Sequence, residues 1–281
     1  MTSYEPVFTP VPVPPLPSMY DLPSESAAEP GLPDEFHYWQ PQLLIQTFRP
    51  PAYPLDRVFA AADLNLYYDS LHTRRYKRPD WFGVVDVPRL VDVGRLSYVI
   101  WREGRAPMVV VELLSPSTVE EDQGETLRGG EPPSKWEVYE SILRVPYYVL
   151  FDRMGNSYRR FRLEGASYQE LPDYQELWIE ELQLGLGLWQ GKFADVERLW
   201  LRWYDRQRNW IATDVEREQE ATERERLRAE QERLRAEQER LRAEQERLRA
   251  EQERLRAEQA EQKVRSLSER LRELGIEPDA P

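Results

Sequence analysis

Short apolar runs bounded by proline, glycine and aspartate recur along residues 35–212, and this pattern predicts β-strands. The expected strands are Leu64–Tyr68, Trp81–Val85, Ser97–Arg102, Met108–Leu114, Tyr147–Asp152, Ser157–Leu163 and Leu199–Tyr204. Apart from Glu112, the run Met108–Leu114 is apolar at successive positions, as is typical of a strand buried on both faces. Because strands outnumber helices, we expect a mixed, sheet-centred fold of the α/β (α+β) class with one core.

One helix is expected inside this region. Ser134 and Glu137 have the spacing of a capping box, and the predicted helix runs from Ser134 to about Leu143. Lys135 and Tyr139 are four residues apart, so their side chains share one face of this helix. Taken alone, Lys135 is typical of a surface lysine.

Residues 214–274 follow a different pattern with a period of seven. The heptad Glu-Arg-Leu-Arg-Ala-Glu-Gln repeats from Glu225 and places leucine at Leu227, Leu234, Leu241, Leu248 and Leu255. Strong helix formers and Glu–Arg pairs three residues apart predict one helix about 90 Å long. With leucine at heptad position d, position a holds Gln231, Gln238, Gln245 and Gln252. One apolar residue per heptad is a poor coiled-coil seam, so a dimeric coiled coil and a lone charged helix both stay open.

The composition divides the chain into three parts. Residues 1–34 hold nine of the 23 prolines and predict a Pro-rich flexible arm. Residues 35–212 contain all nine tryptophans and form the expected globular domain. Residues 213–281 form the charged heptad-repeat helix, and a homodimer built through this part is the expected assembly.

Composition and charge exclude several functions. The chain has no cysteine and two histidines, His37 and His72, so a disulfide framework, a cysteine nucleophile and a Cys-rich zinc site are excluded. Any metal ion should therefore be held by oxygen ligands. The formal net charge of −13 argues against indiscriminate nucleic-acid binding through the whole surface. No apolar run approaches the roughly 20 residues of a membrane helix, so we expect a cytoplasmic protein without membrane contact.

The candidate catalytic residues are Asp80, Glu112 and Lys135. Glu112 interrupts an apolar strand, where an ionised carboxylate needs a salt bridge, a shifted pKa or a metal ion, and a core ion pair explains it as well as a metal site does. Asp80 directly precedes the strand Trp81–Val85, although Pro-Asp alone is also typical of a turn. Two carboxylates on neighbouring strands and one lysine are what metal-assisted phosphodiester hydrolysis requires. The carboxylates would hold Mg²⁺ (or Mn²⁺), and the lysine would offset charge on the phosphate.

A basic segment lies just upstream of Asp80. Its residues Arg74, Arg75, Lys77 and Arg78 are expected to bind phosphates that flank the cleaved bond. The expected partner is therefore nucleic acid, most directly DNA.

Several of these segments resemble a large bacterial family of restriction-endonuclease-like proteins within the PD-(D/E)XK nuclease superfamily. The resemblance covers roughly residues 56–212. It rests on Arg78–Asp80, Val109–Thr118, Glu121–Glu125, Lys135–Tyr139, Val145–Tyr148, Leu184–Trp189 and Trp200–Tyr204. The string Glu-x-Leu-Ser-Pro-Ser-Thr, which begins at Glu112, is its most specific part. A charged helical tail is common in this group.

The resemblance implies a restriction-endonuclease-like fold, in which helices flank a mixed β-sheet, and a divalent-metal nuclease site. It implies that Asp80 and Glu112 are metal ligands and that Lys135 is the catalytic lysine. The residues expected around these three are Asp122, Glu125 and Tyr139, although the two acidic residues fit a solvated loop equally well.

The chain departs from the family pattern near its candidate lysine. The superfamily lysine normally follows the second carboxylate by two residues, where this chain has Leu114, and the family instead supplies it from the Lys-x-x-x-Tyr helix. Met108 stands where many members have aspartate, and residues 126–134 separate the acidic loop from Lys135. An inert nuclease-fold scaffold, assembled through the helical tail, is therefore the alternative to an endonuclease.

Overall fold

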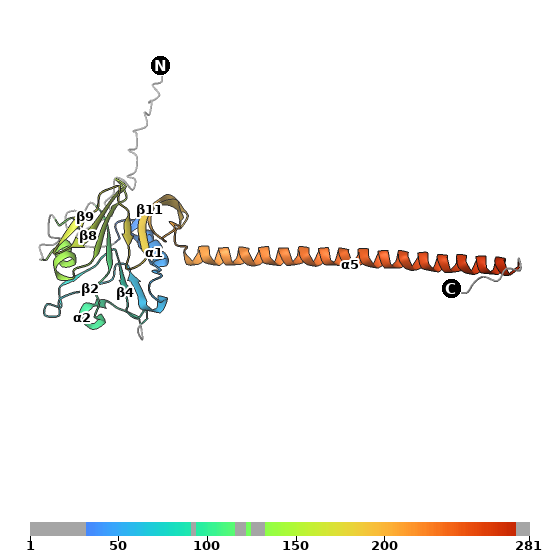
Figure 1. Cartoon of the computed structure of the whole chain (residues 1–281). Coiled ribbons are helices and arrows are strands. Elements are labelled where there is room, and N and C mark those ends of the chain that lie inside the picture. Colours follow the sequence, from blue (N-terminus) through green and yellow to red (C-terminus); the bar gives the residue numbers. More distant parts are fainter. Residues whose placement is uncertain (1–31, 91–93, 116–121, 125–132, 274–281) are drawn as a thin grey trace, which may run out of the picture. The chain divides into compact units, whose positions relative to one another are not determined.

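The computed structural model describes residues 32–90, 94–115, 122–124 and 133–273 (Figure 1). The predicted Pro-rich arm, 1–34, therefore lies outside the described residues except for its last three positions. The chain divides into two compact units, Met1–Asp214 and Val215–Pro281.

Over the described residues, the centre of the first unit is a six-stranded sheet with the order β1-β4-β6-β7-β8-β9. β6 and β7 are parallel, and the other neighbouring pairs are antiparallel. This mixed sheet, accompanied by helices, confirms the predicted fold class. The strands are β1 Val58–Ala61, β4 Trp81–Val85, β6 Val109–Leu113, β7 Tyr147–Asp152, β8 Ser157–Glu164 and β9 Ser167–Glu170, and a 3₁₀ turn, η1 (Leu55–Arg57), leads into β1.

Alternate residues of the central strands enter two hydrophobic cores of the described chain. In β6, Val109, Val111 and Leu113 pack into the first core, whereas Val110 packs into the second. Because side chains alternate along a strand, Glu112 shares the face of Val110. Both faces of β6 are covered, which explains why its sequence is apolar at successive positions.

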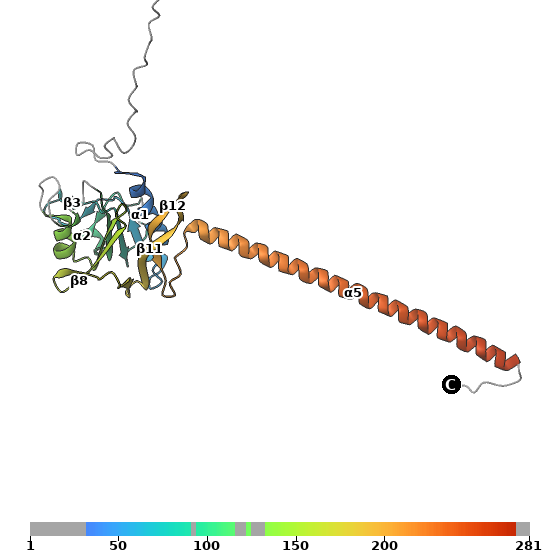
Figure 2. The same cartoon turned by 90° about the horizontal axis from the view of Figure 1, so that it is seen from above.

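The first core lies beneath helix α1 (Glu35–Thr47) and a sheet of three described strands. These strands are β10 Leu177–Ile179, β11 Leu184–Phe193 and β12 Val196–Tyr204. Figure 2 shows α1 beside β12, where the Gln40 side chain bonds both the amide and the carbonyl of Leu201 at 2.8 Å. The apolar pattern does not predict α1, because Pro41 and buried polar residues interrupt its apolar stripe.

The second core lies beneath a small sheet and the connection from β6 to β7. The small sheet has the order β3-β2-β5 over the described residues, with β2 Leu66–Tyr67, β3 Tyr76–Lys77 and β5 Tyr98–Val99. Parallel strands need a crossover connection, and here it includes α4 (Lys135–Glu137) and the π-helix η3 (Val138–Ile142). The predicted helix is therefore confirmed, although its second half is wound as a π-helix. Val138 and Tyr139 pack into the second core, so the crossover covers the same sheet face as Glu112.

The predicted strand Ser97–Arg102 is wrong beyond Val99. Tyr98 and Val99 pair with β2, but Ile100–Glu103 forms the short helix α2. Gly104 ends this helix with a φ of 73°, and its amide bonds the Ile100 carbonyl at 2.8 Å. A glycine directly after an apolar run is a typical helix C-cap, and the strand prediction overlooks that signal.

The strand pattern also misses β1, β3, β9, β10 and β11. The hairpin from β11 to β12 turns at Ala194 and Asp195, which both have positive φ, instead of at the Asn-Gly pair that usually marks such a turn. β11 contains glycines, which resemble turn signals in the sequence. At Gly185 the glycine is required, because an added Cβ would lie 2.0 Å from Cζ of Tyr204.

Helix α5 (Asp214–Glu273) has 60 residues, as the heptad pattern predicts. None of its residues is buried by other described parts of the chain, and the five heptad leucines are 49–54% exposed. No helix within the described ranges combines the length and the apolar character that crossing a membrane requires.

Candidate active site

The register of two strands places Asp80 beside Glu112. β4 and β6 are antiparallel and pair Trp81 with Val111, so the residue before Trp81 lies next to the residue after Val111. The amide of Asp80 donates to Glu112 Oε2 at 3.2 Å, and the amide of Leu113 donates to Asp80 Oδ2 at 2.6 Å. The two candidate carboxylates therefore form one cluster at one end of β4.

The crossover helix supplies two side chains to the same cluster. Lys135 Nζ donates to Glu112 Oε2 at 3.0 Å, and the Tyr139 hydroxyl donates to Glu112 Oε1 at 2.9 Å. Both carboxylate oxygens of Glu112 thus have protein partners. The predicted shared face of Lys135 and Tyr139 is the face that contacts Glu112.

Asp122 completes an ion-paired group around Lys135. Its Oδ1 lies 2.8 Å from Lys135 Nζ, and its backbone carbonyl accepts a hydrogen bond from the Tyr148 hydroxyl at 2.9 Å. Gly124, two residues later, has a φ of 78° and packs so closely on Trp136 that an added Cβ would lie 3.0 Å from that side chain. These contacts fix Asp122 against the crossover helix. Glu125, predicted beside it, lies outside the described residues.

His37 also lies at this site, although the sequence analysis assigns it no role. Its Nε2 lies 3.0 Å from the Leu113 carbonyl oxygen, and its Nδ1 lies 3.0 Å from Asp34 Oδ1. Both oxygens can only accept, so a protonated imidazole with two N–H donors satisfies both. Asp34 is the N-cap of α1 and also pairs with Arg153. In the sequence, the only sign of this arrangement is the Asp-x-x-His spacing, which is typical of a helix start.

Burial dominates the electrostatics of the carboxylates. It raises the pKa of Glu112 well above the usual value, and Asp122 and Asp80 add to this rise while Lys135 opposes it. Burial likewise raises the pKa of Asp80, against the opposing effect of Lys135. Glu112 is fully buried, whereas Asp80 is half-buried, so solvent reaches the cluster at Asp80.

The two cations of the site respond to these carboxylates. Burial, the largest single effect, lowers the pKa of Lys135, but Asp122, Glu112 and Asp80 together raise it well above its usual value. Burial also lowers the pKa of His37, yet its contacts with Asp34 and the charge of Asp80 raise it overall. Lys135 is therefore a permanent ammonium and acts as a fixed positive charge.

Comparison with known protein families shows the family of the chain. The model of the Uma2 family, described as putative restriction endonuclease, matches residues 16–197, which include Asp80, Glu112 and Lys135. The chain belongs to the Uma2 family. No curated protein matches the sequence. The match confirms the resemblance to restriction-endonuclease-like proteins, and the family description is that of a nuclease.

The donor set of this Uma2 site suits a hard divalent cation. Mg²⁺ is usually held by one or two carboxylates together with waters and substrate phosphates, and Asp80 and Glu112 provide two carboxylates. Asp80, Glu112 and Asp122 all act on Lys135, so the carboxyl groups outnumber the lysine at this site. The buried Asp122 oxygens have no hydrogen bond of good geometry to a described residue. No group of three Asp, Glu, His or Cys side chains within the described ranges is placed to hold one ion. Asp80 and Glu112 remain the predicted side-chain ligands.

The predicted phosphate-binding residues lie within β3 or directly beside its two ends, and they are Arg74, Arg75, Lys77 and Arg78. The small sheet that contains β3 covers the same face of the central sheet as Glu112. A guanidinium nitrogen of Arg78 lies 2.5 Å from Asp63 Oδ2, and one of Arg75 lies 3.9 Å from Asp69 Oδ2. These exposed pairs are weak, but they reduce the positive charge that the segment offers to a phosphate.

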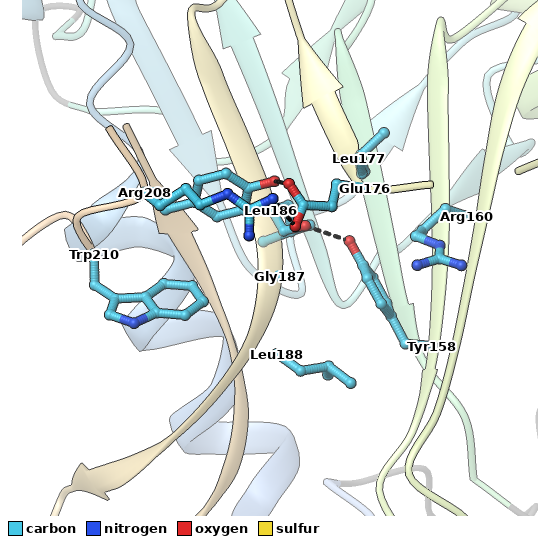
Figure 3. Close-up of a pocket in the computed structure, with 10 residues that line it drawn as sticks. Tyr158, Arg160, Glu176, Leu177, Leu186, Gly187, Leu188, Arg208 and Trp210 are labelled. Atoms are coloured by element: carbon cyan, nitrogen blue, oxygen red, sulfur yellow. Dashed lines mark hydrogen bonds and ion pairs between the residues drawn. The ribbon is translucent and has the colours of Figure 1, made fainter. Parts of the chain in front are cut away.

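A separate cavity of about 300 Å³ lies between β8 and the sheet of β10, β11 and β12 (Figure 3). Tyr158 of β8 pairs with Phe151, a residue of the first core, so this cavity is on the sheet face opposite Glu112. Two of its charged residues, Glu176 and Arg208, pair with each other at 2.6 Å (Figure 3). The cavity is therefore no part of the carboxylate site.

Proposed function

We propose that this Uma2 protein is a metal-dependent endonuclease that hydrolyses phosphodiester bonds in nucleic acid, most directly DNA. The observation that carries the proposal is the convergence of Asp80 and Lys135, from separate parts of the chain, on the Glu112 carboxylate, which bonds the amide of the first and the ammonium of the second. Carboxyl groups whose pKa values are raised by burial, beside a specific charged partner, are typical of functional sites, which supports this proposal.

In this proposal, Asp80 and Glu112 hold Mg²⁺ or Mn²⁺. When bound, such an ion polarises the phosphate and lowers the pKa of a water molecule. Lys135, which stays protonated, offsets negative charge that develops on the phosphate oxygens. Tyr139 orients Glu112 through its hydroxyl, and His37 fixes the end of β6 through the Leu113 carbonyl.

The proposed partners are nucleic acid and a second copy of the chain. Arg74, Arg75, Lys77 and Arg78 would contact phosphates next to the cleaved bond, in competition with their present ion pairs. Self-association through α5 would place two nuclease units in one particle.

One observation favours the alternative, an inert nuclease-fold scaffold. Both oxygens of Glu112 are already engaged by protein donors, and Lys135 neutralises part of the carboxylate charge. In a scaffold, this group would be a buried ion pair whose role ends with folding.

Cleavage and melting of matched variants decide between these functions. The wild type, Glu112→Gln and the control Glu197→Gln, which alters an exposed glutamate of β12, are assayed on supercoiled plasmid with Mg²⁺, Mn²⁺ or EDTA. A nuclease predicts nicking and a metal-dependent rise in Tm for the wild type and the control, with both absent in Glu112→Gln. If the wild type shows neither effect, the scaffold replaces the enzyme. If Glu112→Gln still cleaves, the assigned site is wrong.

A further inference from the structure

The heptad repeat of α5 carries opposite charges on the two sides of its leucine row. With leucine at position d, each e position of the repeat is arginine and each g position is glutamate. The e residues are Arg228, Arg235, Arg242, Arg249 and Arg256. The g residues of the repeat are Glu230, Glu237, Glu244, Glu251 and Glu258, and Glu223 occupies the g position just before it.

The leucine row has no partner within the described chain. Each of its leucines is about half exposed. A helix that stays alone in water could carry polar helix formers at these positions as well. A single apolar row that repeats every seven residues from Leu227 to Leu255 forms one narrow surface that winds slowly around the helix, and it fits another helix of the same kind.

The charges select one orientation of two such helices. In a parallel coiled coil, the g residue of one helix faces the e residue of the following heptad in the other helix. Here every such pair joins glutamate with arginine, beginning with Glu223 and Arg228. In an antiparallel pair, g faces g and e faces e, so glutamate would meet glutamate and arginine would meet arginine along the whole seam.

We infer that α5 binds a second copy of itself in a parallel, in-register, two-stranded coiled coil. The glutamines at position a face the same glutamines of the partner helix, and the in-register alignment pairs more of the heptad leucines than any shifted one. The seam ends after Leu255, because the next apolar residues, Val264 and Leu267, fall outside the heptad. This inference deepens the proposed self-association and is independent of the nuclease chemistry.

A lone charged helix is the competing structure, since charged pairs within one helix also stabilise it. Arg254 and Glu258, four residues apart, form such a pair at 3.2 Å. Intrahelical pairs need no partner, so the two structures differ in the oligomeric state of the full chain.

The absence of native cysteine allows a direct test of orientation in the full-length protein. Gln231→Cys and Gln252→Cys occupy position a near opposite ends of the repeat, and one of the two variants carries an affinity tag. After mixing in a glutathione redox buffer, a parallel dimer forms disulfides between two copies of the same variant. An antiparallel dimer joins the two different variants, and that product would overturn the proposed orientation.

Charge exchange tests the pairing rule and the oligomeric state. One variant carries Arg228→Glu, Arg235→Glu, Arg242→Glu, Arg249→Glu and Arg256→Glu. Its complement carries Glu223→Arg, Glu230→Arg, Glu237→Arg, Glu244→Arg and Glu251→Arg. By sedimentation, each is expected to be monomeric alone and to form a one-to-one heterodimer with the other. The matched control changes the arginines at position c, which faces away from the seam, and is expected to stay dimeric. It carries Arg226→Glu, Arg233→Glu, Arg240→Glu, Arg247→Glu and Arg254→Glu.

A wild type that sediments as a monomer at tens of micromolar would overturn the coiled coil and leave the lone helix. If the wild type is a dimer but the charge-exchanged variants do not form a heterodimer, the proposed pairing of g glutamates with e arginines is wrong. Neither result bears on plasmid cleavage, so failure of this inference and failure of the proposed nuclease are distinguishable.

Discussion

Lys135 Nζ lies 3.0 Å from Glu112 Oε2, although 23 positions separate the two residues in the chain. The fold makes this contact because β6 and β7 are parallel, and the connection between them must cross one face of the sheet. The alternation of β6 turns Glu112 toward that same face. A buried ion pair therefore links the central sheet to its crossover.

Lys135→Met should destabilise the fold strongly, because it leaves Glu112 and Asp122 buried without a cation. Removing one partner of a buried pair typically costs about 3–5 kcal/mol in the free energy of unfolding. Urea unfolding measures this loss. The control Lys192→Met removes an exposed pair with Asp195 and should cost less than about 1 kcal/mol. Equal losses in both variants would contradict the role of Lys135 in the cluster.

The stability of the metal-free protein should fall as pH rises above the ordinary carboxyl pKa values of 3.8 and 4.5. The pKa values of Asp80 and Glu112 are raised in the folded state, mainly by burial, so the folded protein binds these protons more tightly than the unfolded chain does. Stability is lost as pH rises from those ordinary values through the raised ones. The proposed Mg²⁺ would bind the ionised carboxylates, so its stabilising effect should grow over the same range.

Chemical denaturation between pH 4 and pH 8, in EDTA and in Mg²⁺, measures both effects. The double variant Asp80→Asn and Glu112→Gln should lose this part of the pH dependence together with the effect of Mg²⁺. Glu197→Gln should keep both. A double variant with the wild-type profile would place the titrating groups elsewhere.

Gly124→Ala and Gly165→Ala separate backbone strain from contact with the site. Both glycines have positive φ, so alanine costs about 1–2 kcal/mol at either position. At Gly165 nothing lies within 4 Å of the added Cβ, whereas at Gly124 it meets Trp136 at 3.0 Å. We expect Gly165→Ala to keep plasmid cleavage. Gly124→Ala should lower it, because this substitution displaces Asp122 from Lys135. Equal cleavage rates would show that the position of Asp122 is unimportant.

His37 should stabilise the fold at low pH. Burial lowers the pKa of His37, but its contact with Asp34 and the charge of Asp80 raise that pKa above the usual 6.5 overall. The contribution of His37 is therefore fully present below about pH 6.5 and is lost as pH rises through the raised pKa. Stability curves of His37→Gln against the wild type measure this difference. His72→Gln, which removes an exposed pair with Asp69, is the matched histidine control and should leave the curve nearly unchanged.

The sequence predicts local features of the fold better than contacts between distant elements. The strands Trp81–Val85 and Tyr147–Asp152 have the predicted bounds, because their apolar runs end at clear turn residues. Lys135 and Tyr139 share a helix face as their spacing predicts. The hairpin between β11 and β12 escapes prediction, because glycines that make room for aromatic rings resemble turn signals.

The candidate site shows the same division. Glu112 is conspicuous in the sequence, since an ionisable residue in an apolar run is costly wherever it folds. Nothing local predicts that Asp122 pairs with Lys135, or that His37 bonds the end of β6 across 76 positions. Both contacts depend on which elements cover which face of the sheet, and residue patterns within one element do not contain that information.

The crossover between β6 and β7 also bears on how such sites diverge. Lys135 reaches Glu112 from a helix and not from the same strand, so the number of residues between them is free to change without moving either side chain. Loop insertions can accumulate in this interval while the charge cluster keeps its shape. A search for a carboxylate and a lysine at fixed spacing would overlook proteins built in this way. A search for a carboxylate in a buried strand, followed at any distance by a Lys-x-x-x-Tyr helix, would find them.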